Sequence, residues 1–368
     1  MDAVAAIARA VLYEGYILWP YRRSALKNQQ RWTFGGVFPE SWSSTSGTND
    51  VSERSATVLV EGAGDAAIDV RIRFLHIVER RVAKSTATGL EDTDELTVAG
   101  ERYLSWEEAT EREAILPSYT LTELEMPRTV AIDIAAGSET ELLMESDDRV
   151  AGAVQRSWRA IAGALEVFAV CIRPNLYHLT GRVTNTTPNA TPLECGTRAE
   201  AQTHTMISMH MVLRTNGGAF VSTQEPPEPL RSIVESSKAD GLWPVLVGEA
   251  GVRDTMLASP IILSDYPQIA PESPGDLFDG GEIDQLLILN VLALTDEEQR
   301  EMRDSDPHAR EILDRCRSMS PEQLMSLHGM VRGVGEIHEG RGVNTLSDLQ
   351  SDLRDPRWHA DSPPSGGQ

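Results

Sequence analysis

Residues 68–74 read Ile-Asp-Val-Arg-Ile-Arg-Phe, and this stretch decides the fold class. Apolar and charged residues alternate along it, which is the pattern of a β-strand with one buried and one solvated face. Similar strand patterns recur further along the chain, at 129–134, 165–172 and 176–184. Several short strands with turn signals nearby predict an antiparallel β-sandwich-like core rather than a doubly wound α/β fold.

Two glycine-containing stretches are predicted to turn the chain. Asn216-Gly217 readily supplies the positive φ angles of a tight turn, so 204–213 and 219–223 are expected to form a hairpin. Gly62-Ala63-Gly64-Asp65-Ala66-Ala67 matches the loose form of the dinucleotide-binding fingerprint, which requires a helix directly after it. Because a strand pattern follows instead, we interpret this stretch as a hairpin turn.

Helical signals mark both ends of the chain. Near the N-terminus apolar residues recur at helical spacing, at Val4, Ile7, Ala8, Val11 and Leu12. Three helix starts are indicated by capping residues near the C-terminus: Thr295 with Glu298, Asp306 with Pro307, and Ser320 with Pro321. The inner stripe of the second of these helices should be Ala309, Ile312, Leu313 and Cys316. Residues 282–294 are almost wholly apolar after the first turn and fit either a buried helix or a core strand.

These patterns predict an α+β protein with an antiparallel β-sandwich-like core, an N-terminal helix and a helical C-terminal third. The expected organisation has four parts. They are an N-terminal helix with an aromatic and basic segment (1–42), a β-rich domain (56–281), a helical region packed on it (282–333) and a mostly flexible tail (334–368).

The composition restricts the partners and the compartment. The chain has 368 residues with 33 basic and 56 acidic side chains, a formal net charge of −23, and such a surface repels phosphate backbones. We therefore expect no nucleic-acid partner, and no apolar run is long enough for a membrane span. The 3 cysteines are odd in number and form no C-x-x-C element, which favours a cytoplasmic protein without a disulfide framework.

Common catalytic motifs are absent from the sequence. It contains no G-x-S-x-G elbow, no G-x-x-x-x-G-K phosphate loop and no H-E-x-x-H zinc motif. The commonest hydrolase, nucleotide-hydrolysing and zinc-protease classes are therefore excluded. We assign no catalytic residues, and the sequence favours a role other than catalysis.

The block between Tyr13 and Trp42 is the predicted functional surface. It holds eight aromatic residues, and residues 1–42 carry five basic and three acidic groups in a chain that is otherwise strongly acidic. Arginine, tryptophan and tyrosine dominate binding hot spots, so we predict that the block binds a protein partner or an anionic ligand. The residues concerned are Tyr21, Arg22, Arg23, Lys27, Arg31 and Trp32. The alternative is that the aromatic rings complete the core while arginine stems pack along them.

A transition-metal site is the second predicted site. On a regular strand, His204, Met206 and His210 share one face, and Cys195 could approach from the preceding loop. Imidazole and thioether groups suit copper or another soft metal, although hydrogen-bonded histidines and core methionines explain the pattern equally well. Acidic residues between 265 and 284, including Asp276, could hold a hard cation, or could place negative charge at the start of the next helix.

Two segments resemble an uncharacterised family associated with gene clusters of the oxygen-tolerant, actinobacterial type of nickel-iron hydrogenase. The first segment begins at Tyr13 and includes Tyr21-Arg22-Arg23-Ser24-Ala25-Leu26-Lys27 and Arg31-Trp32-Thr33-Phe34-Gly35-Gly36. The second includes Ser259-Pro260-Ile261-Ile262 and Tyr266-Pro267-Gln268-Ile269-Ala270-Pro271-Glu272-Ser273-Pro274-Gly275-Asp276-Leu277-Phe278-Asp279. Together they cover a minor part of the chain.

The resemblance implies an accessory protein that assembles, stabilises or matures the hydrogenase through protein contacts. No catalytic residues are established for such a family, so the resemblance supplies none. Two alternatives remain open from the sequence. One is a metal-binding protein or enzyme that uses His204, Met206 and His210, and the other is a structural subunit of a larger complex.

Overall fold

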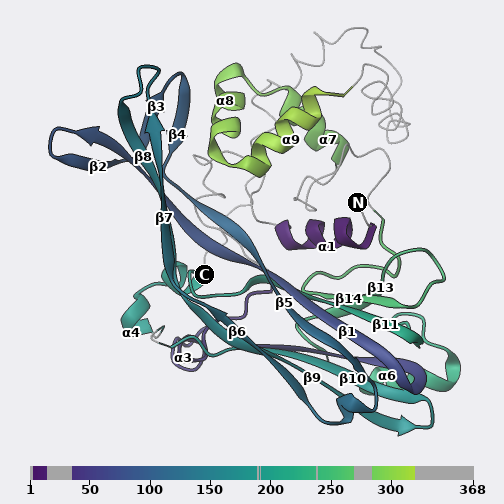
Figure 1. Ribbon diagram of the computed structural model, residues 1–368. Helices are drawn as coiled ribbons and strands as arrows, with labels where there is room; N and C mark the ends of the chain where they lie inside the picture. The colour runs from purple at the N-terminus through teal and green to yellow at the C-terminus, as the bar shows by residue number, and fades with distance from the viewer. Residues whose placement is uncertain are drawn as a thin grey trace, which may run out of the picture.

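The computed structural model describes residues 3–14, 35–188, 190, 192–237, 239–268 and 284–319 (Figure 1). In these residues antiparallel strands predominate and a few helices pack against them, which confirms the α+β class. The strands are β1 (Glu53–Thr86), β2 (Gly89–Thr93), β3 (Glu95–Val98), β4 (Glu101–Leu104), β5 (Trp106–Thr120), β6 (Arg128–Ile134), β7 (Gly137–Met144), β8 (Val150–Trp158), β9 (Ile161–Arg173), β10 (Leu176–Asn185), β11 (Ile207–Phe220), β12 (Ala239–Asp240), β13 (Trp243–Leu246) and β14 (Thr255–Ser259).

Twelve of the described strands join one hydrogen-bonded sheet, in which β13, β14, β11, β1, β10, β9 and β6 follow one another in space. β3 and β4 form a separate pair. Because the other strands are connected in a single sheet, the expected sandwich of two sheets is not confirmed. The period-two segments predicted from the sequence do form strands, in β1, β6, β9 and β10.

β1 organises the sheet because it changes neighbours along its 34 residues. Residues 53–61 pair with β10, residues 67–80 pair with β5, and the last residues pair with β8 and β2. Along the edge opposite β5, β1 pairs with β11 between residues 60 and 75 and then with β8 between residues 79 and 84. A single strand therefore runs from the main sheet into a second group of strands.

The two glycine stretches do not form turns, so both hairpin predictions are wrong. Gly62 pairs with Gly218 and Ala67 pairs with Asn216, which leaves residues 63–66 as a bulge inside β1. Two carbonyl groups of the bulge accept hydrogen bonds, since Leu121 N donates to Ala66 O at 3.0 Å and Thr122 N donates to Gly64 O at 2.9 Å. Glycine permits the close approach of two backbones as well as a turn, and the sequence signal is the same for both.

Helices cover one face of the sheet, and the main apolar core lies on the other (Figure 1). Val70, Ile72 and Phe74 of β1 belong to the main core, whereas Leu75 and Ile77 contact the helices. The described helices are α1 (Ala3–Tyr13), α3 (Glu40–Ser43), α4 (Pro192–Cys195), α5 (Arg198–Gln202), α6 (Arg231–Ser236), α7 (Asp284–Leu292), α8 (Asp296–Ser305) and α9 (Pro307–Arg317). Short 3-10 turns occupy Glu123–Glu125 and Glu228–Leu230.

The helical predictions are confirmed where the chain is described. The predicted apolar stripes of α1 and α9 are buried. Thr295 and Glu298 form the capping box of α8, and the Asp306 carboxylate accepts a hydrogen bond from His308 N at 2.8 Å at the start of α9. Residues 284–292 form α7, which decides the open choice between helix and strand. The predicted helix at Ser320 and the tail at 334–368 lie outside the described residues.

The end of β1, together with β2, β7 and β8, projects from the main sheet as an arm (Figure 1). β3 and β4 pack on one face of the arm and close a small apolar core. This core includes Val82 of β1, Val98 of β3, Leu143 of β7 and Val154 of β8. The arm is therefore an independently packed extension that shares β1 with the main sheet.

Candidate partner-binding surface

The sequence-predicted surface made of Tyr21, Arg22, Arg23, Lys27, Arg31 and Trp32 lies outside the described residues. Three other aromatic residues of the same block are described. Tyr13, Phe38 and Trp42 are 3%, 2% and 4% exposed, so these rings complete apolar clusters. At both ends of the block, the described aromatic rings therefore belong to the core, as the alternative interpretation of the sequence expects.

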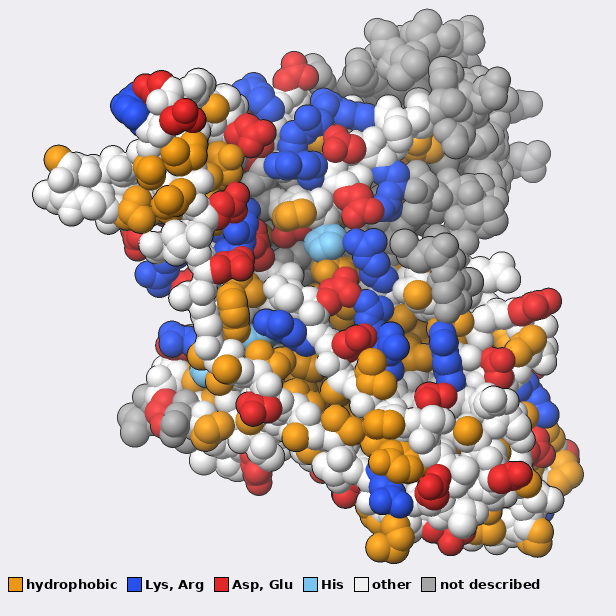
Figure 2. Space-filling model, viewed as in Figure 1, with side chains coloured by type: hydrophobic (Ala, Val, Ile, Leu, Met, Phe, Trp, Pro, Cys, Tyr) orange, Lys and Arg blue, Asp and Glu red, His pale blue; other side chains and the backbone are white. Residues whose placement is uncertain are grey.

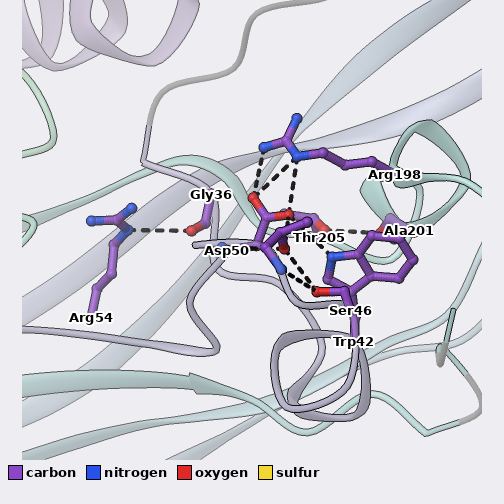
Figure 3. A network of polar contacts seen from close by, with 9 residues as sticks. Gly36, Trp42, Ser46, Asp50, Arg54, Arg198, Ala201 and Thr205 are labelled. Atoms are coloured by element: carbon purple, nitrogen blue, oxygen red, sulfur yellow. Dashed lines mark hydrogen bonds and ion pairs between the residues drawn. The ribbon is translucent and has the colours of Figure 1, made fainter.

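A polar network around Asp50 fixes the segment that contains Phe38 and Trp42 (Figure 3). The Asp50 carboxylate accepts hydrogen bonds from Trp42 Nε1 at 3.1 Å and from Arg198 Nη2 at 2.8 Å. The Arg198 guanidinium also lies 4.9 Å from the centre of the Phe38 ring. Burial raises the pKa of Asp50, but hydrogen bonds from Arg198, Trp42 and Thr48 outweigh this effect and hold the pKa below its usual value. The network holds this segment against α5, of which Arg198 is the first residue.

The predicted metal ligands do not share a strand face, because His204 lies in a turn before β11 and a bulge in β11 separates Met206 from His210. Arg73 pairs with His210 and Leu75 pairs with Ile207, so β11 has one residue more than β1 between these pairs. Ser208 is at the bulge, and its backbone has a φ angle of 51°. A one-residue bulge reverses the alternation of side chains. Met206 therefore lies in the main core with Met209, while His210 lies beside Arg73 on the helix-covered face.

Both histidines of the predicted metal site have backbone contacts. His204 Nδ1 lies 3.1 Å from Ala160 O, and His210 Nδ1 lies 3.3 Å from Ser208 O. Burial lowers the pKa of both rings, to about 4 for His210. Cys195 is buried against Phe38 and Trp42, and burial raises the pKa of its thiol.

Within the described residues, no group of three or more His, Cys, Asp or Glu side chains is placed to hold a metal ion. Asp276 and most of the predicted acidic loop lie outside those residues. Asp265 is described and has a structural role, because its carboxylate accepts hydrogen bonds from Ser222 Oγ and from Leu246 N at 2.8 Å.

The arm presents an exposed row of apolar side chains on the face opposite its small core. The strand registers place these side chains on one side, because Leu142 pairs with Ala153 and Ala153 pairs with Ala83. Leu90 pairs with Ser85, two residues after Ala83, and Met144 pairs with Val150. We call the four most exposed members the apolar row: Leu90 (43% exposed), Leu142 (55%), Met144 (44%) and Val150 (39%). Figure 2 shows hydrophobic side chains gathered over this part of the arm. Clustered exposed apolar side chains of this kind mark interaction sites.

A polar groove of about 900 Å³ lies at the base of the arm. Strand alternation places its main lining residues on the same face as the apolar row. They are Glu79 and Arg81 of β1, Ser138 and Thr140 of β7, and Gln155 and Ser157 of β8. The face therefore changes from apolar at its tip to charged and polar at its base, which is the composition of a protein-binding surface with a polar rim.

An ionic network on the opposite face holds the strands of the arm together. Arg80 and Arg156 face each other across the β1–β8 pair. Glu108 of β5 bridges them, because it accepts hydrogen bonds from Arg80 Nη1 at 2.8 Å and from Arg156 Nε at 3.0 Å. Arg156 also pairs with Glu141 of β7 at 3.1 Å. The network connects four strands and fixes the surface that carries the apolar row.

This surface was missed at the level of the sequence. Ser138, Thr140 and Leu142 alternate with Glu139 and Glu141, and every one of these positions except Leu142 is polar. A strand that is solvated on both faces gives little period-two signal in hydrophobicity. The apolar run Leu142-Leu143-Met144 was the available indication.

In the described part of the chain, no helix combines the length and the apolar character needed to cross a bilayer. No protein-family model matches the sequence, and comparison with curated proteins finds no significantly similar relative.

Proposed function

We propose that this protein is a non-catalytic cytoplasmic accessory protein that assembles, stabilises or matures a nickel-iron hydrogenase through protein contacts. The resemblance of the segments at 13–36 and 259–279 supports the hydrogenase as the partner. The arm supports the mode of action. These two parts of the proposal have separate tests.

The apolar row is the observation that carries the mode of action. Leu142 and Met144 expose about half of their surfaces on strand β7, where the backbone is held in a sheet. Burying such side chains against a partner stabilises a complex by about 25 cal/mol for each Å² of apolar surface removed from water. The Glu108 network keeps the row in one arrangement before binding, so less conformational entropy is lost when a complex forms.

The test is capture of hydrogenase subunits and maturation proteins from a hydrogenase-expressing host, with the tagged protein at its native level. The double variant Leu142→Ser, Met144→Ser should lose the captured proteins. The matched control is Val170→Ser, Ile172→Ser on β9, which removes two exposed apolar side chains of similar exposure (53% and 38%). If the Leu142→Ser, Met144→Ser variant captures as much protein as the wild type, binding belongs to another surface. Recovery of no hydrogenase protein by the wild type would refute the proposed partner.

A second variant tests the surface predicted from the sequence. Arg22→Ala, Arg23→Ala, Arg31→Ala should weaken capture without loss of folding if the aromatic and basic segment takes part in binding. Size-exclusion chromatography of the captured complex then separates an accessory protein, which leaves the mature hydrogenase, from a structural subunit, which remains at fixed stoichiometry.

A further inference from the structure

The outer edge of β7 is open to another strand. Among the described residues β7 pairs with β8 alone, although it runs for 8 residues from Gly137 to Met144. Glu139, Glu141, Leu142 and Met144 are all exposed, so no described element packs over the side chains along this edge. A row of backbone N–H and C=O groups along an open edge is a template for strand addition.

The two faces of β7 specify the side chains of an added strand. Glu139 and Glu141 lie on the face of the ionic network and remain 60% and 59% exposed although both pair with Arg156. Leu142 and Met144 lie on the other face, in the apolar row. Because side chains alternate between the faces of a sheet, a strand beside β7 places one set of residues next to the glutamates and the other set next to the apolar row.

Charge decides between a second copy of this chain and a different partner. An antiparallel pairing of two β7 strands centred on Thr140 sets Glu139 of each copy against Glu141 of the other, and like charges in opposed positions destabilise a sheet. The net charge of −23 adds repulsion between copies. A strand that carries basic residues opposite Glu139 and Glu141 is attracted by both effects.

We propose that β7 binds an extended segment of a partner protein in which basic and apolar residues alternate, and that this segment adds a strand to the arm. The proposal rests on the proposed function, because it assigns a mode of recognition to the same surface. The basic residues contact Glu139 and Glu141, and the apolar residues contact Leu142 and Met144. The polar groove at the base of the arm then receives the chain as it leaves the edge.

The experiment uses the full-length protein and three synthetic eight-residue peptides with blocked ends. The first alternates Lys and Val, the second alternates Glu and Val, and the third has the Lys-Val sequence with alternate backbone amides methylated. Fluorescence anisotropy should detect binding of the first peptide alone. Hydrogen exchange should show new protection of backbone amides in residues 137–144 when that peptide is bound.

Two double variants test the assigned contacts. Glu139→Gln, Glu141→Gln should weaken binding of the Lys-Val peptide about fivefold, the effect of two exposed charge pairs. The matched control Glu225→Gln, Glu235→Gln makes the same change in net charge on other exposed residues and should leave binding unchanged. Because Glu141 contributes to the ionic network, the hydrogen-exchange measurement on the wild type provides a test that does not depend on folding of the variant.

Several outcomes would overturn the proposal. They are equal binding of the Lys-Val and Glu-Val peptides, undiminished binding of the methylated peptide, and protection outside residues 137–144. A dimer of the free protein that protects residues 137–144 would assign the edge to a second copy. The hydrogenase capture experiment separates the two proposals: peptide binding without capture refutes only the hydrogenase as partner, and capture without peptide binding refutes only strand addition.

Discussion

Arg198 and Asp50 are 148 residues apart in the chain, yet the Arg198 guanidinium donates hydrogen bonds to both carboxylate oxygens of Asp50. The Asp50 side chain is 9% exposed, whereas that of Arg198 is 46% exposed. The pair therefore places a nearly buried charge between the segment at 36–50 and α5. Trp42 is held by the same carboxylate.

Replacing Asp50 by Ala should destabilise the protein by about 2–3 kcal/mol, because the change leaves the Trp42 and Arg198 donors without their acceptor. The free energy of unfolding from urea titration measures the effect. Asp92→Ala is the control, since Asp92 is 62% exposed and lies 3.6 Å from Arg81, and its loss should cost less than about 0.5 kcal/mol. Similar destabilisation by both variants would contradict the assigned role.

Glu108→Ala should destabilise the arm, because Arg80 and Arg156 then face each other without the carboxylate between them. Their side chains are only 11% and 26% exposed, so we expect a loss of about 2–3 kcal/mol. Hydrogen exchange of β7 and β8 should increase more than that of β9. Glu113→Ala on the same strand removes a half-exposed partner of Arg71 and should leave exchange in β7 and β8 unchanged.

Stability should fall as the pH is lowered from 7 to 5, in part because of His210. Burial, with a smaller contribution from Arg73, lowers the pKa of His210 to about 4 in the folded protein. The unfolded chain has the ordinary pKa of about 6.5 and so binds the proton first, which favours unfolding as the pH falls through this window.

The loss due to His210 should be about 2 kcal/mol between pH 7 and pH 5. His210→Met should remove this part of the pH dependence, measured as the difference in unfolding free energy between the two pH values. His76, whose pKa burial and Arg112 also lower to about 4, should supply a comparable part that remains in the variant. An unchanged pH dependence in His210→Met would show that this ring is not buried in neutral form.

Thr295→Ala should destabilise α8 by about 1 kcal/mol, because it removes the capping box with Glu298. Thr295→Ser keeps the hydroxyl and should retain most of the stability. Thermal unfolding of the two variants under identical conditions measures the difference. Equal melting temperatures would show that α8 does not depend on this cap.

The sequence predicted those elements whose signal is local. Alternation at 68–74 marks a half-buried strand, and the apolar stripe at Val4, Ile7 and Val11 marks a helix that packs on one side. The capping residues Thr295 and Asp306 make the hydrogen bonds that their types predict. Each of these features depends on residues that are close together in the sequence, so the local residue pattern is enough to predict it.

The sequence did not reveal features that depend on distant segments. Gly62 and Gly218 pair across two strands, and nothing near either residue distinguishes a bulge from a turn. The extra residue at Ser208 reverses the strand alternation, so the shared face predicted for Met206 and His210 is not formed. The first half of β7, Ser138-Glu139-Thr140-Glu141, carries part of the candidate binding edge, and its polarity is that of an ordinary loop.

The continuity of β1 has a mechanical consequence. Its 34 residues enter both the main core and the small core of the arm, so a load applied at the tip is transmitted along the backbone rather than absorbed by a flexible joint. Pulling on the arm should strain the ladder that β1 shares with β11, next to the helices that rest on Leu75 and Ile77. A partner that binds the arm therefore pulls on the same strand against which the helices pack.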